Sequence, residues 1–161
     1  MNNILLSILV PTRNRQVYAA NVVKHILQFS NINFELVIQD NSDSANLKNL
    51  LGLYKNDSRL NYNYHKETLS FVDNFSKGIE NCKGEYVTII GDDDGICKGI
   101  FDVVEWCKIN KIKALSPSLS LVYFWPNSQV NFADNDGMLI VNDISCKIKV
   151  TNPKKELEKF M

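Results

Sequence analysis

The segment Ile4-Leu-Leu-Ser-Ile-Leu-Val10 is a nearly continuous apolar run, and the polar loop Pro11-Thr-Arg-Asn-Arg15 follows it directly. An apolar run of this length is typical of a strand buried on both faces of a parallel sheet. Beyond the loop, apolar residues at helical spacing between residues 17 and 29 predict a helix, with Asn14 as its N-cap. The sequence therefore predicts a strand that ends at Pro11, a polar loop and a helix.

The same unit recurs along the chain. Phe34–Ile38, Leu60–His65 and Glu85–Ile90 are predicted strands, each followed by a polar segment and a helical pattern, and the last helix is predicted from Ile100 to Trp106. Four alternations of strand and helix predict an α/β fold, in which a mostly parallel sheet carries helices on both faces.

Three polar loops follow predicted strands: Pro11–Arg15, Gln39–Ser44 and Gly91–Gly95. Ligands of open α/β sheets bind outside the carboxyl ends of the strands, so these loops are expected to meet at one edge. Downstream, Ala114–Trp125 predicts one or two strands and Met138–Val141 a short one, whereas the last fifteen residues predict a frayed helix or a cut end.

Composition limits the classes of function. The chain has 161 residues, enough for one domain, with 18 basic and 18 acidic side chains and a net charge of zero. This balance argues against a nucleic-acid partner. The N-terminal apolar run lacks a basic leader and is far shorter than the roughly 20 residues that cross a bilayer. We therefore expect a cytoplasmic protein, and the Lys154-Lys155 pair is compatible with a peripheral contact at the inner face of the membrane.

The acidic loop Gly91-Asp-Asp-Asp-Gly95 is the sharpest chemical feature. Three adjacent carboxylates repel one another unless they are solvated or neutralised by a cation. Carboxylate oxygens just past a buried strand suit Mg²⁺ or Mn²⁺, which would in turn hold a diphosphate. The alternative interpretation is an acidic surface turn, and the loop by itself leaves both open.

Three ordered segments resemble a known family. Ser7-Ile-Leu-Val-Pro-Thr-Arg-Asn-Arg15 is similar to the opening strand and loop of family 2 glycosyltransferases, and Phe34-Glu-Leu-Val-Ile-Gln-Asp-Asn-Ser42 is similar to their second strand and loop. Residues 74–94 follow the family pattern N-x-x-x-G-I-x-x-A-x-G-E-Y-V-x-x-L-D-x-D-D, with Gly91 in place of its first Asp. The resemblance covers roughly residues 4 to 110 and implies the GT-A fold, the Rossmann-like fold of nucleotide-diphospho-sugar transferases.

The resemblance implies an enzyme that transfers a sugar from a nucleotide-diphosphate donor, UDP-type favoured, to a glycan or lipid-linked acceptor, with inversion and with Mg²⁺ or Mn²⁺ on the diphosphate. Cell-surface polysaccharide biosynthesis is the implied context. Asp40 matches the carboxylate that contacts the base, Asp92 lies next to the donor ribose, and Asp93 and Asp94 match the metal-binding acids. The remaining donor-binding residues implied by position are Pro11, Thr12, Arg13, Asn14 and Asn74.

The catalytic base is the gap in this assignment. An inverting transfer needs a carboxylate to deprotonate the acceptor hydroxyl, and the family's position for it falls beyond residue 161. Asp134 and Asp136 are weak candidates, and a solvated turn around them is the favoured interpretation. We therefore expect a nucleotide-sugar-binding core over residues 1–126 and the start of a truncated acceptor region over 127–161.

Two alternatives remain. The first is a catalytically incomplete nucleotide-sugar-binding module that lacks its own base. The second is a flavodoxin-like phosphate-binding or acceptor-Asp signalling domain, which the sequence disfavours because no strand-end lysine stands in an obvious place.

Overall fold

The computed structural model describes residues 4–115, 121–124 and 138–141. The chain divides into two compact units, residues 1–114 and 115–161. The boundary expected at residues 126 and 127 lies outside the described residues, and so does the helix or cut end expected for the last fifteen. Each unit is described by itself.

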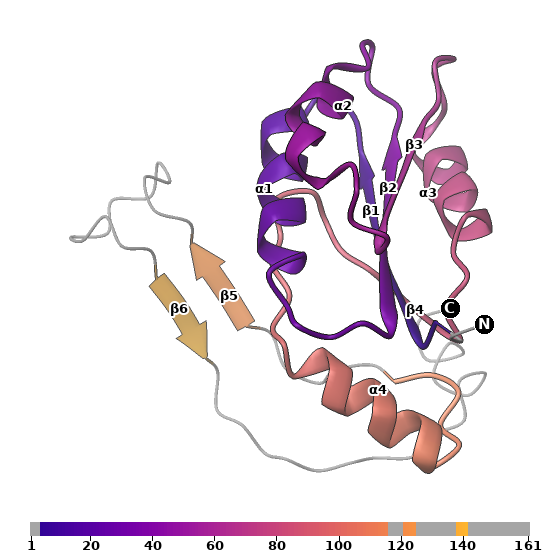
Figure 1. The fold of residues 1–161 in the computed structure, drawn as a ribbon, viewed down its shortest axis with the longest axis vertical. Coiled ribbons are helices and arrows are strands. Elements are labelled where there is room, and N and C mark those ends of the chain that lie inside the picture. The colour runs from indigo at the N-terminus through magenta and orange to yellow at the C-terminus, as the bar shows by residue number, and fades with distance from the viewer. Residues whose placement is uncertain (1–3, 116–120, 125–137, 142–161) are drawn as a thin grey trace, which may run out of the picture. The chain divides into compact units, whose positions relative to one another are not determined.

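The first unit is built on a sheet of four parallel strands (Figure 1). The strands are β1 (Leu6–Thr12), β2 (Phe34–Asp40), β3 (Leu60–Tyr64) and β4 (Tyr86–Ile89). Their order is β3-β2-β1-β4, and every neighbouring pair is parallel. The sequence-based expectation of a parallel α/β sheet is confirmed.

Helices cover both faces of this sheet, as expected (Figure 1). They are α1 (Gln16–Ile26), α2 (Asn46–Leu50) with the short 3₁₀ helix η1 (Gly52–Tyr54), α3 (Phe71–Glu80) and α4 (Ile100–Ile109). Apolar residues of α1, α2 and α4 share one buried cluster with alternate residues of β1 and β2. Helix α3 lies on the opposite face, where Gly78 is packed against Leu9 and Gln39. This arrangement leaves the carboxyl ends of the strands at one edge.

All seven residues of β1 are buried, as predicted for a strand covered on both faces. The expectation that the strand stops at Pro11 is wrong, because β1 continues through Pro11 to Thr12. Parallel strands direct successive residues to alternate neighbours. Leu9 accepts a bond from Ile90, and Thr12 accepts one from Asn41. Pro11 therefore faces the β4 side past the end of that strand, where its missing N–H has no partner to lose.

Asn14 is not the N-cap of α1, which is also a correction. The N-cap is Arg15, and no side chain caps the helix. Asn14 has φ of 56°, a left-handed conformation that asparagine tolerates better than most residues. Its side chain is directed to Asp43, across the gap between the first two polar loops.

Helix α3 starts with a capping interaction. The Ser70 hydroxyl accepts from the backbone N–H of Asp73 at 3.1 Å and donates to the Asp73 carboxylate at 2.6 Å. This arrangement explains the acidic residue at position 73, because a carboxylate in the first turn also suits the positive end of the helix dipole. The cap fixes where α3 begins, beside the loop that follows β3.

The second unit is described at two strands, β5 (Leu121–Phe124) and β6 (Met138–Val141), which pair antiparallel. Strands were expected in both places. Among the described residues of the chain, no helix is long and apolar enough to cross a membrane.

Candidate functional site

A cavity of about 400 Å³ opens at the carboxyl edge of the sheet in the first unit. The loops after β1 and β4, the start of the loop after β2 and the N-terminal part of α3 all contribute to it, so the expected meeting of the three polar loops is confirmed. Its lining residues are Pro11, Thr12, Arg13, Arg15, Asn41, Leu69, Ser70, Phe71, Asn74, Phe75, Gly91 and Asp92.

The topology explains the position of the cavity. From β1 the chain moves outward through β2 to β3 on one side and returns to β4 on the other. The order of strands therefore reverses between β1 and β4, so the carboxyl ends of these two strands form the switch point of the sheet. A crevice at such a switch point is the usual ligand site of open α/β sheets.

The loop after β4 folds into a tight turn. The backbone N–H of Asp94 donates to the carbonyl of Gly91 at 3.2 Å, and the backbone N–H of Gly91 donates to the carboxylate of Asp94 at 3.1 Å. A Cβ at position 91 would lie 2.7 Å from Oδ2 of Asp94 and 3.0 Å from Oδ1 of Asp93. A side chain at this position would therefore have to displace these two carboxylate oxygens, and glycine leaves them room to fold back over the turn.

Arg15 links the first two carboxylates of the turn. Its Nε lies 3.0 Å from Oδ1 of Asp92, and its Nη2 lies 2.6 Å from Oδ2 of Asp93. The guanidinium therefore neutralises part of the charge that the sequence places in this loop. Sequence reasoning missed Arg15, because nothing in its spacing shows that α1 turns its first residues toward the loop after β4.

Asp92 is the buried member of the turn. The hydroxyl of Thr12 donates to its Oδ2 at 2.6 Å and connects the ends of β1 and β4. Burial raises the pKa of Asp92 above its usual value of 3.8, and the bond from Thr12 and the charge of Arg15 counteract this only in part. Asp93 lies in a different environment, with its side chain 47% exposed.

Asp40, at the end of β2, is fully buried. Its Oδ1 accepts from the backbone N–H of Ser42 at 2.9 Å, and its Oδ2 accepts from the hydroxyl of Tyr62 at 2.8 Å. Burial and the bond to Asp40 raise the pKa of Tyr62, so that hydroxyl remains a donor. Asp40 is not among the lining residues of the cavity.

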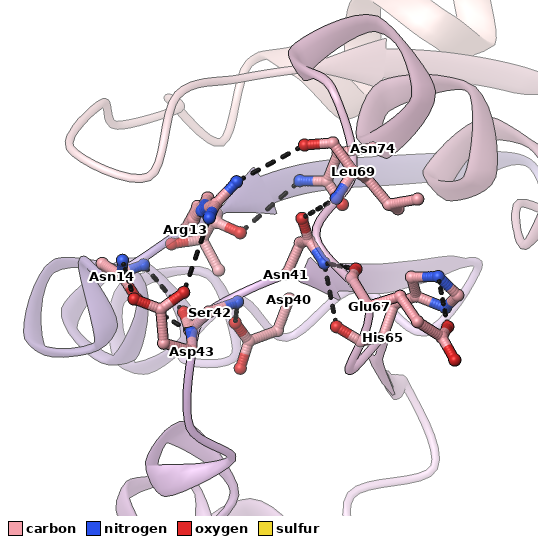
Figure 2. A network of polar contacts seen from close by, with 11 residues as sticks. Arg13, Asn14, Asp40, Asn41, Ser42, Asp43, His65, Glu67, Leu69 and Asn74 are labelled. Carbon is pink, nitrogen blue, oxygen red and sulfur yellow. Dashed lines mark hydrogen bonds and ion pairs between the residues drawn. The ribbon is translucent and has the colours of Figure 1, made fainter.

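Asn41 lies directly after Asp40 and does line the cavity. Figure 2 shows its amide bonded to the loop after β3. Its Nδ2 donates to the carbonyls of His65 and Glu67, and its Oδ1 accepts from the backbone N–H of Leu69. All these distances fall between 2.7 and 2.9 Å, so Asn41 fixes the path of the chain toward α3.

Arg13 and Asn14 are tied to the loop after β2 (Figure 2). Arg13 contacts the carboxylate of Asp43 at 3.5 Å and the carbonyl of Leu69 at 3.4 Å, both long and exposed interactions. Asn14 makes a reciprocal pair with Asp43, two bonds of 2.9 Å each. Arg13 therefore remains at the cavity wall, whereas Asn14 holds the loop after β2 through Asp43.

The structure brings five of the sequence-predicted residues into the cavity lining: Pro11, Thr12, Arg13, Asn74 and Asp92. Asn14 and Asp40 support the neighbouring loops, and Asp93 and Asp94 adjoin the cavity through the turn. Asp134 and Asp136 lie outside the described residues. Leu69, Ser70, Phe71 and Phe75 were missed as lining residues. For Phe71 and Phe75 the reason is that apolar positions on a helix are indistinguishable from core positions in sequence.

Proteins of known structure share this fold. Among solved structures, TarS of S. aureus (residues 1–349) superposes with a TM-score of 0.59 at 17% identity, over 75% of this chain and 34% of that one. A structure of the same TarS fragment in complex with UDP-GlcNAc gives a TM-score of 0.55 at 15% identity, over 75% of this chain and 33% of that one. The fold is therefore that of the GT-A glycosyltransferases.

Sequence comparison identifies the family. The family model described as Glycosyl transferase family 2 matches residues 7–99, so the chain belongs to glycosyl transferase family 2. The GalNAc(5)-diNAcBac-PP-undecaprenol beta-1,3-glucosyltransferase of Campylobacter jejuni is 32% identical over 99 residues. The abequosyltransferase RfbV of Salmonella typhimurium is 23% identical over 105 residues.

These relatives are much longer than the chain. The match covers 58% of this chain and 31% of the Campylobacter protein, and 63% of this chain and 32% of the Salmonella protein. The chain thus spans about a third of the length of these two curated relatives.

Proposed function

We propose that this chain carries the donor-binding part of a glycosyltransferase, which transfers a sugar from a nucleotide-diphosphate sugar to a glycan or lipid-linked acceptor. The observation that carries the proposal is the cavity at the β1/β4 switch point, which is lined by Arg13, Arg15 and Asp92, with Arg15 paired to Asp92 at 3.0 Å. A nucleotide diphosphate needs such a mixture, because its base and ribose offer donors to carboxylates and amides whereas its phosphates require cations.

The relatives support a UDP-type donor and a lipid-linked acceptor. The TarS fragment has been solved with UDP-GlcNAc, and the Campylobacter relative is named for transfer to an undecaprenol-linked diphosphate glycan. By analogy, we place this protein in the biosynthesis of a cell-surface polysaccharide, in the cytoplasm and at the inner face of the membrane where a lipid-linked acceptor would be reached.

Mg²⁺ or Mn²⁺ is the proposed cofactor, held by Asp93 and Asp94. No group of three or more His, Cys, Asp or Glu side chains close enough to bind a metal occurs among the described residues. Magnesium in phosphate sites is nonetheless often held by one or two carboxylates, with water and substrate phosphates completing the shell. The turn over Gly91 therefore fits the ion, which would neutralise negative charge on the departing diphosphate.

Arg15 would have two roles in this scheme. In the ligand-free protein it neutralises Asp92 and Asp93 at 3.0 and 2.6 Å. When the ion takes part of that charge, the guanidinium would become available for a phosphate oxygen. Inversion at the anomeric carbon is part of the proposal, with a carboxylate outside the described residues as the base.

Thermal stability tests donor binding. UDP with Mn²⁺ should raise the melting temperature of the chain, because a ligand at a hundredfold excess over Kd stabilises the folded state by about 2.7 kcal/mol. UDP with EDTA should give a much smaller shift, and Asp93→Asn should abolish the difference between the two conditions. An equal shift with and without the chelator would contradict the metal role, and no shift with any nucleotide diphosphate would contradict donor binding.

Turnover of the sugar nucleotide separates the enzyme from an incomplete binding module. Release of UDP from a UDP-sugar, with and without a lipid-linked acceptor, should be measured for the chain and for Asp93→Asn. Loss of turnover in the variant supports the transferase. Metal-dependent binding of UDP without turnover in the parent chain supports the module.

A further inference from the structure

The helix that carries Arg15 does not determine where its side chain lies. Arg15 is the N-cap of α1, no side chain of the described residues caps this helix, and its first turn contains no acidic residue. The N-terminus of a helix carries a partial positive charge, so a cation at this end is disfavoured by the helix dipole. The contacts that hold the guanidinium must therefore come from groups outside the helix backbone.

Two edges of the guanidinium are occupied by carboxylates of the turn after β4. Nε lies 3.0 Å from Oδ1 of Asp92, and Nη2 lies 2.6 Å from Oδ2 of Asp93. A planar fork can meet two acids at once when it is held in one orientation, because a rotation about its stem would break at least one of the two contacts. The double contact therefore depends on what fixes the plane of the guanidinium.

The ring of Tyr18 covers a face of the same guanidinium. Cζ of Arg15 lies 4.9 Å from the centroid of this ring, within the range of a cation–π contact. Tyr18 follows Arg15 by three residues, a spacing that places two side chains on the same side of a helix. The guanidinium is thus contacted on two edges by acids and on one face by a ring.

Tyr18 is placed for this contact rather than for the core. Its side chain is 55% exposed, it is not one of the buried residues of α1, and it does not line the cavity. Exposed ion pairs are weak in part because two flexible side chains must be held in one geometry. A ring that restricts Arg15 within its own helix lowers this cost before the acids are reached.

We infer that Tyr18 is a positioning residue that holds the Arg15 guanidinium across Asp92 and Asp93, so that the turn after β4 carries its own counter-cation and binds a divalent ion in competition with it. The inference rests on the proposed function, in which Asp93 helps to hold Mg²⁺ or Mn²⁺, and it adds a control on how tightly the ion binds. Without the ion, Arg15 offsets the repulsion between adjacent carboxylates. With the ion present, the ring of Tyr18 sets how strongly Arg15 competes.

Binding of Mn²⁺ alone, followed by electron paramagnetic resonance, tests the inference without nucleotide or turnover. Tyr18→Leu should bind Mn²⁺ about two- to fivefold more tightly than the parent chain, the range expected when an exposed cation–π contact is removed. Tyr18→Phe retains a ring and should bind Mn²⁺ as the parent does. Val17→Ala is the matched control, because Val17 is 65% exposed next to Tyr18, and it should also leave the affinity unchanged.

A double variant shows whether Tyr18 acts through Arg15. Arg15→Gln removes the competing cation, so adding Tyr18→Leu to this variant should leave its Mn²⁺ affinity unchanged. A general loosening of the fold would instead shift the affinity in both backgrounds.

Nuclear magnetic resonance follows Arg15 itself. Mg²⁺ is diamagnetic, and its addition should move the Nε–H signal of Arg15 towards that of free arginine, because the ion displaces the guanidinium from Asp92 and Asp93. In Tyr18→Leu the same movement should be complete at a lower Mg²⁺ concentration.

The outcomes separate this inference from the proposed function. If the parent binds Mn²⁺ and Tyr18→Leu binds it equally well, or if Tyr18→Leu has the same effect in the Arg15→Gln background, the positioning role of Tyr18 is overturned while the proposed metal site stands. If Mn²⁺ binds but Mg²⁺ leaves the Arg15 signal in place, the competition is overturned. If neither the parent nor Arg15→Gln binds Mn²⁺, alone or with UDP, the proposed metal role fails and the inference fails with it.

Discussion

The ends of β2 and β4 carry carboxylates at the same edge of one sheet, yet the two loops differ in almost every other respect. Asp40 after β2 is fully buried and bonded at both oxygens, whereas Asp93 after β4 keeps a side chain 47% exposed. The partners of Asp40 are neutral donors, and the partner of Asp92 and Asp93 is the cation Arg15. The loop after β2 is therefore a structural support. The carboxylates of the loop after β4, by contrast, can exchange Arg15 for another cation.

The difference follows from the position of each strand in the sheet. Strand β2 lies between β1 and β3, so Tyr62 of β3 can reach Asp40 from the side. Strand β4 is at the end of the order β3-β2-β1-β4, and no further strand of the described part flanks its loop. Identical side chains at strand ends therefore acquire different chemistry from their neighbours rather than from their own type.

Removing the Asp40 carboxylate, in the loop after β2, should have the largest effect on stability. Asp40→Ala leaves the N–H of Ser42 and the hydroxyl of Tyr62 unpaired in the interior, so we expect about 3 kcal/mol of lost stability, measured by urea unfolding. Asp43→Ala is the matched control, because Asp43 is exposed in the same loop and should cost less than about 1 kcal/mol. Equal losses for the two variants would remove the distinction between a buried support and a surface acid.

Tyr62→Phe tests the support of Asp40 by removing one hydroxyl oxygen. Deleting the hydroxyl leaves one oxygen of Asp40 without its donor, and we expect a loss of about 1–2 kcal/mol in urea unfolding. UDP affinity should fall only slightly, because Tyr62 does not line the cavity. A large loss of UDP affinity at unchanged stability would place Tyr62 in direct contact with the ligand.

The pH dependence of stability tests the loop after β4, which contains Asp92. Burial raises the pKa of Asp92 in the folded chain above 3.8, so between pH 4 and that higher pKa the folded state retains a proton that the unfolded state has lost. The contribution of Asp92 to stability is therefore fully present below pH 4 and decreases as the pH rises through its folded-state pKa. Compared with Asp92→Asn, the parent should lose relative stability between pH 4 and 7 in urea unfolding, whereas parallel curves would show that burial does not affect this acid.

Arg15→Gln should have the smallest effect on stability, below about 1 kcal/mol, since Arg15 is a largely exposed ion-pair partner. Its effects on ligands should have opposite signs. Mn²⁺ alone should bind a few-fold more tightly, because two carboxylates lose their competing cation, and pyrophosphate with Mn²⁺ should bind more weakly. The Mn²⁺ affinity of Arg15→Lys should lie between those of the parent and Arg15→Gln. Electron paramagnetic resonance measures this affinity. An affinity that is unchanged in Arg15→Gln would show that Arg15 does not compete with the metal.

Much of the fold follows from the sequence, because hydrophobic periodicity depends on local neighbours. The run from Ile4 to Val10 has no polar face, and this is what β1 requires between two layers of helices. The meeting of the three polar loops follows from parallel topology, without knowledge of any contact. The end of β1 was placed too early. Proline disrupts a strand only where its missing N–H would have bonded to a neighbouring strand, and whether β4 extends that far cannot be read from the local sequence.

The site was predicted less completely. The family resemblance indicated Asp92 and Asn74, but the environment of Asp40 depends on Tyr62, which comes from another strand. Phe71 belongs to a helical pattern of apolar residues that by itself does not tell a core position from an exposed one, and the structure leaves it 75% exposed. Arg15 was seen only as part of a polar loop, because the pairing of a guanidinium with two acids of a distant turn is decided by how α1 packs.

The bond between Thr12 and Asp92 joins residues 80 positions apart. In chain order, β1, β2 and β3 all precede β4, so the acidic turn is the last wall of the cavity to be synthesised. We therefore expect a nascent chain that stops short of residue 90 to form the β3-β2-β1 half of the sheet and yet to retain no nucleotide.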